Sequence, residues 1–258
     1  MLEPIIYFVY NRSMDLLKVL YFITLVVYVL QCIFARRIKL NWALIIVAVV
    51  IHSIYFFGWE GVAFILVTGV VSTAAELISL KTPFNIFGVS YKYDLSNNIF
   101  PSKIVFGKVY PIEVTAAWIL LKYLSFFLVS FIAFHLNISV IIKALLSALV
   151  LVSFDLLLDP YAVFQGAWKW SKPGKFFEIP WRNFLGWFVV GFIISLIFIN
   201  LKPIEMRDTA MIIPVFVVCA LFPGLLGGKL ISLSKIKGII ALLPLVFFII
   251  VGLSFLFP

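Results

Sequence analysis

The stretch that decides the fold reads SFDLLLDPYAVFQGAWKWSKPGKFFEIPWRNFLGW and covers residues 153–187. Its apolar first part ends with two carboxylates, Asp155 and Asp159. A short basic loop broken by glycine and proline follows, with four tryptophans around it: Trp168, Trp170, Trp181 and Trp187. Carboxylates at the edge of a membrane span are costly and mark functional sites. Tryptophans beside them favour an apolar ligand that carries or develops positive charge.

The composition predicts a membrane protein. Of the 258 residues, 64% are hydrophobic and only 12% are charged, which is too little polar surface for a soluble protein. A spanning helix takes about 20 apolar residues. The apolar runs lie at residues 16–34, 41–58, 61–79, 112–135, 139–158, 182–200, 209–227 and 237–257. We therefore expect an all-α polytopic membrane protein, a single bundle of about eight transmembrane helices over residues 1–258, with the site-bearing core at about 70–190. The acidic start MLEPIIYFVYN lacks the apolar run of a cleavable signal peptide.

The net charge of +9 is sorted by loop, which argues against a nucleic-acid partner. Most of the 20 lysines and arginines fall in the loops after the first, third, fifth and seventh predicted helices: Arg36, Arg37, Lys39, Lys81, Lys92, Lys103, Lys108, Lys169, Lys172, Lys175, Arg182, Lys229, Lys235 and Lys237. The opposite loops hold only Lys202 and Arg207, although Arg12 and Lys18 near the N-terminus weaken the contrast. By the positive-inside rule, the sequence predicts a multi-pass protein of the cell membrane with basic loops in the cytoplasm and both termini external.

The cysteines and histidines predict no metal site. Cys32 and Cys219 lie within predicted spans without a partner spacing, so we interpret them as small apolar core residues. His52 and His135 are single histidines with no clustered Cys or acid nearby, which favours packing roles. Glu60 is expected in a solvated loop at the outer boundary.

Four acids are predicted to share one depth near the cytoplasmic face. If the third span begins near residue 61, Glu76 lies roughly 22 Å further in, at about 1.5 Å per residue. Asp155 lies at nearly the same depth, Asp159 follows one turn later, and Glu113 opens the fourth span from the same side. Each acid alone is also explained by helix capping or by an ion pair. Four at one depth, beside aromatic loops, favour a shared catalytic layer.

Two further features concern the fourth span and the loops. Lys122 lies well inside the span, so its ammonium is expected either to snorkel or to pair with Glu76 or Asp155. The septets FGVSYKY at 87–93 and FQGAWKW at 164–170 share an aromatic residue, a glycine and an aromatic-Lys-aromatic ending. The likeness covers seven residues and is equally explained by coincidence. If real, it predicts that both loops close over one cavity.

These motifs together resemble the membrane carotenoid hydratases of the CruF type, also called the carotenoid biosynthesis protein family. The resemblance covers roughly residues 70–190 and is carried by three blocks. The first contains Glu76, Gly88, Tyr91 and Tyr93, and the second contains Pro111, Val114 and Trp118. The third is the most specific, and it contains Asp155, Asp159, Pro160, Gly166, Trp168, Trp170, Ile179, Pro180, Asn183, Gly186 and Trp187.

The resemblance implies an enzyme without a cofactor that adds water across the terminal double bond of an acyclic carotenoid, giving a tertiary alcohol. Its implied partners are the carotenoid, water, membrane lipids and other enzymes of the carotenoid pathway. The expected catalytic residues are Asp155, Asp159, Glu76 and Glu113. The expected substrate-binding residues are Tyr91, Tyr93, Trp118, Trp168, Trp170, Trp181, Asn183 and Trp187.

The chemistry of the residues agrees with hydration. A buried Asp can hold a proton and deliver it to the alkene, and a second carboxylate can deprotonate the attacking water. Aromatic faces stabilise the cation, and the apolar bundle is expected to hold the polyene. Two other classes fit less well. A prenyltransferase uses acids to bind Mg²⁺ and a diphosphate but normally has two facing acidic motifs, and a carrier places charges along a pathway.

Overall fold

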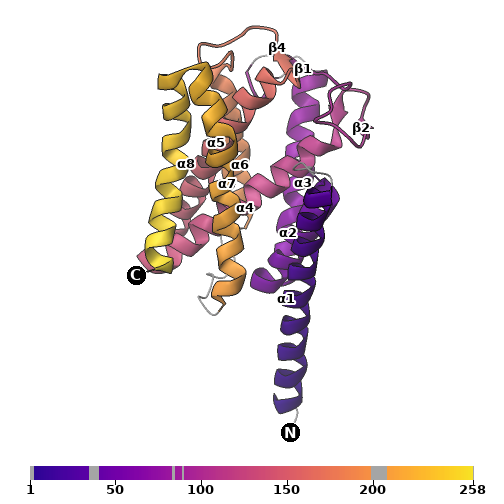
Figure 1. Ribbon diagram of the computed structural model, residues 1–258, viewed down its shortest axis with the longest axis vertical. Coiled ribbons are helices and arrows are strands. Elements are labelled where there is room, and N and C mark those ends of the chain that lie inside the picture. The colour runs from indigo at the N-terminus through magenta and orange to yellow at the C-terminus, as the bar shows by residue number, and fades with distance from the viewer. Residues whose placement is uncertain (1–2, 35–40, 83–84, 89, 199–207, 258) are drawn as a thin grey trace. The chain divides into compact units, whose positions relative to one another are not determined.

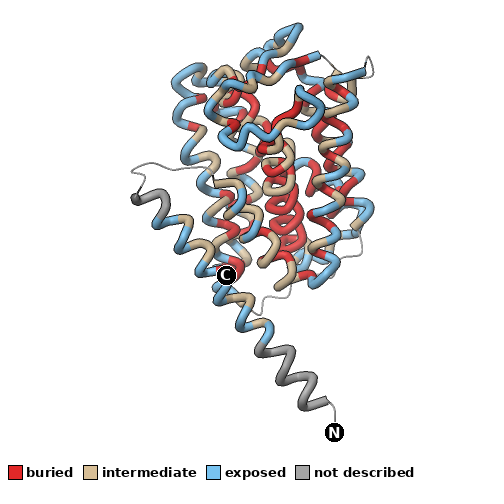
Figure 2. The backbone as a smooth tube through the Cα atoms, turned by 90° about the vertical axis from the view of Figure 1, so that its right-hand side faces the viewer, coloured by how far each residue is buried: buried red, intermediate tan, exposed pale blue. Residues whose placement is uncertain are grey.

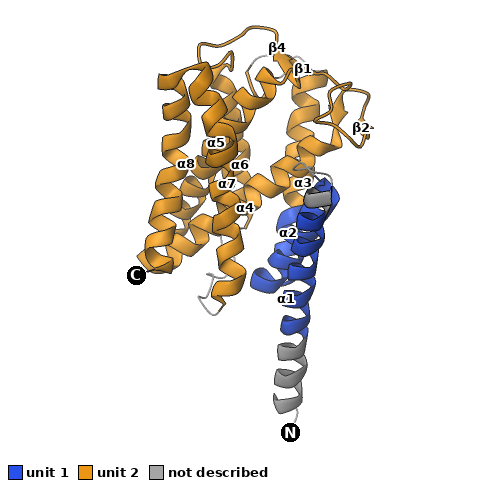
Figure 3. Ribbon diagram, viewed as in Figure 1, with its two compact units in different colours: residues 1–66 blue, residues 67–258 orange. Residues whose placement is uncertain are grey.

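The computed structural model describes residues 3–34, 41–82, 85–88, 90–198 and 208–257, with side chains omitted for 3–12 and 31–34. These residues form eight helices and four short strands (Figure 1). They group into two compact units, residues 1–66 and 67–258 (Figure 3). The helical fold class is thereby confirmed, and the single domain over 1–258 stays a prediction. The cations of the first basic loop, the side chain of Cys32, and Lys202 and Arg207 lie outside the described residues.

The first unit is built from α1 (Glu3–Phe34), α2 (Trp42–Phe57) and the start of α3 (Trp59–Lys81). Asn41 starts α2 because its side chain accepts a hydrogen bond from the Leu44 amide at 3.2 Å. His52 is buried between the Tyr21 and Phe56 rings, so it packs as predicted. The prediction for Glu60 was wrong in one respect: it is exposed, but it lies in the first helical turn of α3.

The second unit is a helical bundle around α4 (Ile112–Leu136) and α5 (Val140–Phe164). α5 packs against α4, α6 (Trp181–Ile197), α7 (Thr209–Leu233) and α8 (Lys235–Leu256). α4 is buried on every side over residues 121–132, about three turns, including Phe126, Phe127 and Phe131 (Figure 2). The outer faces of α7 and α8 expose large apolar side chains, which is the pattern of a bundle surrounded by lipid. Cys219 is buried in α7, as predicted.

Six of the helices are long and apolar enough to cross a membrane: α1, α3, α4, α5, α7 and α8. α2 and α6 are apolar but shorter, at 16 and 17 residues. The structure therefore supports a multi-pass membrane protein, and the crossing of the membrane by α2 and α6 stays a prediction.

The end of α5 differs from the expected end at residue 158, because the helix continues through Pro160 to Phe164. The chain leaves the helix at Gly166, whose φ of +73° suits a residue without a Cβ. The Ala167 amide donates to the Ala162 carbonyl at 2.9 Å and closes this end. Pro160 removes only one backbone donor near the last turn. Asp155 and Asp159 therefore lie on one continuous helical face, four residues apart.

Four short strands cover one end of the second unit. β1 (Tyr91–Tyr93) pairs antiparallel with β4 (Trp168–Trp170), and β2 (Val105–Phe106) pairs with β3 (Tyr110–Pro111). The first pair, which we call the aromatic ribbon, joins the two septets that the sequence analysis compared (Figure 1). Tyr91 lies opposite Trp170 and Tyr93 opposite Trp168. The loops after α3 and α5 therefore meet, as the septet likeness predicted.

The loop after α7 reaches the same end of the unit. Lys237, in the first turn of α8, donates from Nζ to the Lys175 carbonyl at 2.7 Å. The loops after α3, α5 and α7, which carry most of the described cations, thus share one end of the bundle. This is the arrangement that the alternating charge pattern requires.

Candidate active site

Asp155 and Asp159 of α5 form a buried pair with Asn183 of α6. Asp155 is 0% exposed and Asp159 is 3% exposed. Nδ2 of Asn183 donates to Asp155 Oδ2 at 3.0 Å and to Asp159 Oδ2 at 2.5 Å. The two carboxyl groups also interact with each other. One amide therefore holds both acids, and the backbone places them on the same side of α5.

Asp155 has one oxygen without an internal partner. Its Oδ1 is buried and makes no hydrogen bond within the part of the chain that the structure describes. Buried polar atoms are rarely left unpaired, so such an atom points to a bound water or ligand. Oδ1 is thus the oxygen of Asp155 whose hydrogen-bonding capacity is unused among the described residues.

Glu76 of α3 forms a second buried acid site. Its Oε2 accepts hydrogen bonds from the hydroxyls of Tyr91 and Tyr93, the latter at 3.0 Å. Its Oε1 accepts from Nε1 of Trp118 at 3.1 Å. Three donors from β1 and α4 therefore surround this carboxyl group.

The two tyrosine hydroxyls keep their protons. Burial raises the pKa of Tyr91 and of Tyr93 well above the ordinary value, and the negative charge of Glu76 raises both further. A tyrosine that stays protonated remains a hydrogen-bond donor. The environment of Glu76 is thus a fixed set of donors.

Stacked indoles connect the two acid sites. The rings of Trp118 and Trp187 are parallel within 10°, with centroids 3.7 Å apart. Trp118 donates to Glu76, and Trp187 lies one turn after Asn183 on α6. The charge of Glu76 also acts on both aspartates. The structure thus brings Glu76 into the same region as the aspartate pair. The two indole faces that stack on each other are covered and do not face a ligand.

Sequence reasoning did not select Phe87 as a site residue. Its ring is 1% exposed and lies 6.4 Å from the Trp118 centroid and 6.1 Å from that of Tyr91. It reaches this position because Gly186 of α6 leaves room for it: a Cβ there would lie 2.6 Å from Phe87 Cδ1. Both residues lie in the quoted motifs, but only their packing reveals that they belong together.

Sequence reasoning also did not select Tyr110, which joins a chain of hydroxyl contacts between α4 and α3. Its hydroxyl lies 3.1 Å from Thr115 Oγ1, which lies 2.7 Å from Thr73 Oγ1. Burial, followed by the charge of Glu76, raises the pKa of Tyr110. No sequence spacing links these three residues.

The structure does not bring Glu113 and Trp181 into the cluster. Glu113 is buried, and its Oε1 accepts from the Ser102 amide at 2.7 Å, so its described contact anchors the loop before α4. Trp181 is 67% exposed at the start of α6, with the Arg182 guanidinium near its ring. Their roles in catalysis and binding stay predictions.

A groove of about 660 Å³ lies along the aromatic ribbon, and all four aromatic residues of the ribbon line it. Tyr91 and Trp170 contact each other at 4.8 Å between centroids, and Tyr93 and Trp168 at 5.6 Å. Lys92 lies between the two tyrosines and is exposed. The groove is also lined by Ser90, Asp94, Asn97, Gln165, Gly166, Lys169 and Ser171.

The predictions for Lys122 were wrong. It is fully buried, so it does not snorkel, and its Nζ donates to Ser147 Oγ at 2.8 Å and to Ser195 Oγ at 2.6 Å. Small hydroxyls on α5 and α6 satisfy the amine where an acid was expected. Lys122 thus joins three helices and belongs to neither acid site.

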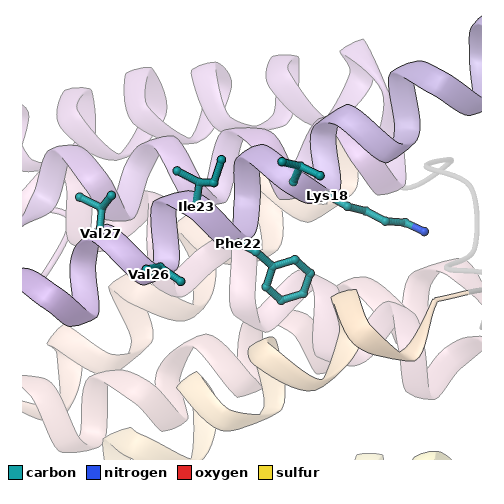
Figure 4. Close-up of a pocket in the computed structure, with 6 residues that line it drawn as sticks. Lys18, Phe22, Ile23, Val26 and Val27 are labelled. Atoms are coloured by element: carbon teal, nitrogen blue, oxygen red, sulfur yellow. The ribbon is translucent and has the colours of Figure 1, made fainter.

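A second hollow, of about 390 Å³, lies on the first unit and has no catalytic character. It follows one face of α1 and is lined by apolar side chains and Lys18 (Figure 4). Such a surface is typical of a helix in contact with lipid.

Comparison with known proteins identifies the family. The model of the carotenoid biosynthesis protein family matches residues 19–253, which is most of the chain. The chain belongs to the carotenoid biosynthesis protein family. No curated protein and no solved structure matches it. The matched region of this family member includes all the residues of both acid sites and of the aromatic ribbon.

Proposed function

We propose that the protein is a carotenoid hydratase that adds water across a terminal double bond of an acyclic carotenoid. The observation that carries the proposal is the buried Asp155–Asp159 pair, which one amide binds and whose Asp155 Oδ1 has no hydrogen-bond partner among the described residues. Family membership supports a carotenoid substrate.

Hydration of such an alkene needs a strong acid and a stabilised cation. The acid protonates the less substituted carbon, and water then captures the tertiary cation. Asp155 offers a buried carboxyl oxygen for the first step, and general acid catalysis typically contributes about 10²–10⁴-fold.

The aromatic ribbon supports the second requirement. Its four rings, from Tyr91, Tyr93, Trp168 and Trp170, form one contiguous group next to Glu76. An aromatic face near a desolvated cation stabilises it by about 2 kcal/mol. The negative charge of Glu76, which accepts hydrogen bonds from Tyr91 and Tyr93, also stabilises the cation.

The alternative prenyltransferase function is less compatible with the donor set. Mg²⁺ binds oxygen ligands, whereas Asn183 directs N–H groups at both aspartates. Within the described ranges, no three His, Cys, Asp or Glu side chains form a group suited to a metal ion. The carboxyl pair is therefore better suited to hold a proton than a cation.

The test is expression in a host that makes acyclic carotenoids, followed by mass analysis of the pigments. A hydratase adds the mass of one water per modified end, and the gain should be absent with the empty vector. The activity should be indifferent to a chelator and to added prenyl diphosphate. Dependence on both, with transfer of a prenyl group, would establish the prenyltransferase function.

A further inference from the structure

We infer that the two acid sites divide the reaction: Asp155, with Asp159, delivers the proton to carbon, and Glu76, held by Tyr91, Tyr93 and Trp118, takes the proton from the attacking water. The inference rests on the proposed hydratase function. It assigns a water-activating site that is separate from the proton-donating site.

Glu76 has the surroundings of a base. An indole N–H can only donate a hydrogen bond, so Oε1 of Glu76 is an acceptor toward Trp118. Oε2 receives two tyrosine hydroxyls that keep their protons. Donors to both oxygens stabilise negative charge on Glu76 and offset part of the cost of burying that charge. We therefore assign Glu76 as the group that accepts the proton from water.

The aspartate pair has the opposite surroundings. Asp155 and Asp159 interact with each other inside the protein, where two adjacent negative charges cannot both be accommodated. Asn183 donates a hydrogen bond to one oxygen of each aspartate. These hydrogen bonds stabilise the single negative charge that remains on the pair. We infer that the pair holds one proton, and Asp155 Oδ1 is a buried oxygen that receives no hydrogen bond from the described residues.

The reaction balances with water as the only co-reactant. The alkene π electrons take the proton from Asp155, a C–H bond forms, and the adjacent carbon becomes the tertiary cation. A lone pair of water forms the C–O bond, and the proton released from that oxygen goes to Glu76. Return of this proton through solvent to the aspartate pair restores both groups.

The aromatic ribbon places Glu76 next to the aqueous side. Tyr91 and Tyr93 line the groove and also donate to Glu76, so they belong to both. Tyr93 is only partly buried. Trp170 adds a buried Nε1 that has no hydrogen-bond partner among the described residues, which is a further donor for water. The route that we infer for water therefore runs from the groove past the Tyr91 and Tyr93 hydroxyls to Glu76.

The test uses the full-length protein and an acyclic carotenoid in D₂O. Wild type should form the alcohol with deuterium at the protonated carbon. Glu76→Gln should lower alcohol formation by at least about 100-fold. It should still protonate the alkene, and because the cation collapses back by losing a proton, deuterium should accumulate in the end group of recovered substrate. Asp155→Asn should give neither alcohol nor deuterium in the substrate.

Two further variants keep the test decisive. The double variant Tyr91→Phe with Tyr93→Phe keeps Glu76 but removes two of its hydrogen-bond donors. If Glu76→Gln does not fold, this variant replaces it, and it should likewise form little alcohol while deuterium accumulates in the substrate. Glu60→Gln, an exposed position, is the matched control and should behave as wild type. Alcohol formation by folded Glu76→Gln above about a tenth of wild type, or substrate without deuterium, would overturn the division of roles. Failure of the wild type to form alcohol would instead overturn the proposed function.

Discussion

At the scale of single residues, Asp155 is expected to be indispensable for activity. Asp155→Asn keeps the side-chain volume and the oxygen that accepts from Asn183, but the amide cannot protonate carbon. Activity should fall by about 10²–10⁴-fold. Pigment analysis measures the loss, and size-exclusion chromatography of the purified variant checks that the fold is retained. A folded variant with more than roughly a tenth of wild-type activity would place the proton donor elsewhere.

Asp159 is expected to support catalysis through its interaction with Asp155. Asp159 does not cap the end of α5, because the helix continues past it to Phe164. Asp159→Asn takes away the second carboxyl group that shares the proton with Asp155, so activity should drop by about 100-fold with little change in thermal stability. A large loss of stability at unchanged activity per folded molecule would show instead that Asp159 is structural.

The sequence predicted which residue types form the site but not all of their contacts. Asp155 and Asp159 were found because acids are unusual near the end of an apolar span, and Asn183 was found from the family resemblance. Phe87 and Tyr110 could not be distinguished from other core aromatics, since only their contacts in the fold, Phe87 with Trp118 and Tyr110 with Thr115, set them apart. The partners of Lys122 were missed for the same reason: a serine in a span gives no sign that it accepts from an amine on another helix.

At the scale of elements, the close contact of α6 with the loop after α3 is expected to control the site. Gly186→Ala would place a Cβ 2.6 Å from Phe87 Cδ1 and 3.0 Å from the Ile86 carbonyl oxygen, so the loop must shift. A displacement of about 1 Å can cost on the order of 10²-fold in rate. Gly228→Ala in α7 meets nothing within 4 Å and is the matched control. Equal activity of the two variants would contradict this role of Gly186.

Lys122 is expected to stabilise the contact of α4 with α5 and α6 without taking part in the reaction. Lys122→Ala leaves a cavity and should cost about 2–5 kcal/mol, as for truncation of other long buried side chains. Lys122→Met fills most of the volume with an apolar group, and such replacements of buried ions are often nearly neutral. Thermal unfolding in detergent should rank the variants in this order. A loss of activity in folded Lys122→Met would give the lysine a chemical role.

The elements themselves were largely predictable, with one instructive failure. Long apolar runs located all eight helices because a membrane leaves the backbone no alternative to helical hydrogen bonding. Pro160 misled the prediction for α5: a proline near the last turn removes one donor, and Gly166 ends the helix instead. The meeting of the loops after α3 and α5 was predicted from a likeness of seven residues that chance would equally explain, but their pairing as strands β1 and β4 was not.

At the scale of the whole molecule, the location of the polyene stays a prediction, and the packing of α4 favours a place outside the bundle interior. The sequence analysis expected the polyene within the apolar bundle, but α4 is enclosed by side chains of the protein itself over the stretch that contains Phe126, Phe127 and Phe131. Trp118 and Trp187 stack above this region, and Lys122 crosses it. The chain of a long substrate is therefore expected to extend into the surrounding lipid, with only its end group reaching the acids.

The orientation in the membrane is the remaining prediction at this scale. The loops after α3, α5 and α7 share one end of the second unit, and that end carries the cations Lys92, Lys169 and Lys237. By the positive-inside rule, we expect this end to face the cytoplasm. With eight crossings, both termini would be external and the candidate site would lie near the cytoplasmic leaflet.

Labelling of single cysteines checks this orientation. In a background without Cys32 and Cys219, a cysteine at the exposed Lys172 should react with an impermeant thiol reagent only after the membrane is opened. A cysteine at Lys202, between α6 and α7, should react in intact cells, because α6 must cross the membrane for the two positions to lie on opposite sides. Reaction of both on the same side would mean that α6, at 17 residues, does not span. The eight-helix topology would then be wrong, although the acid sites, which depend on contacts within the second unit, would be unaffected.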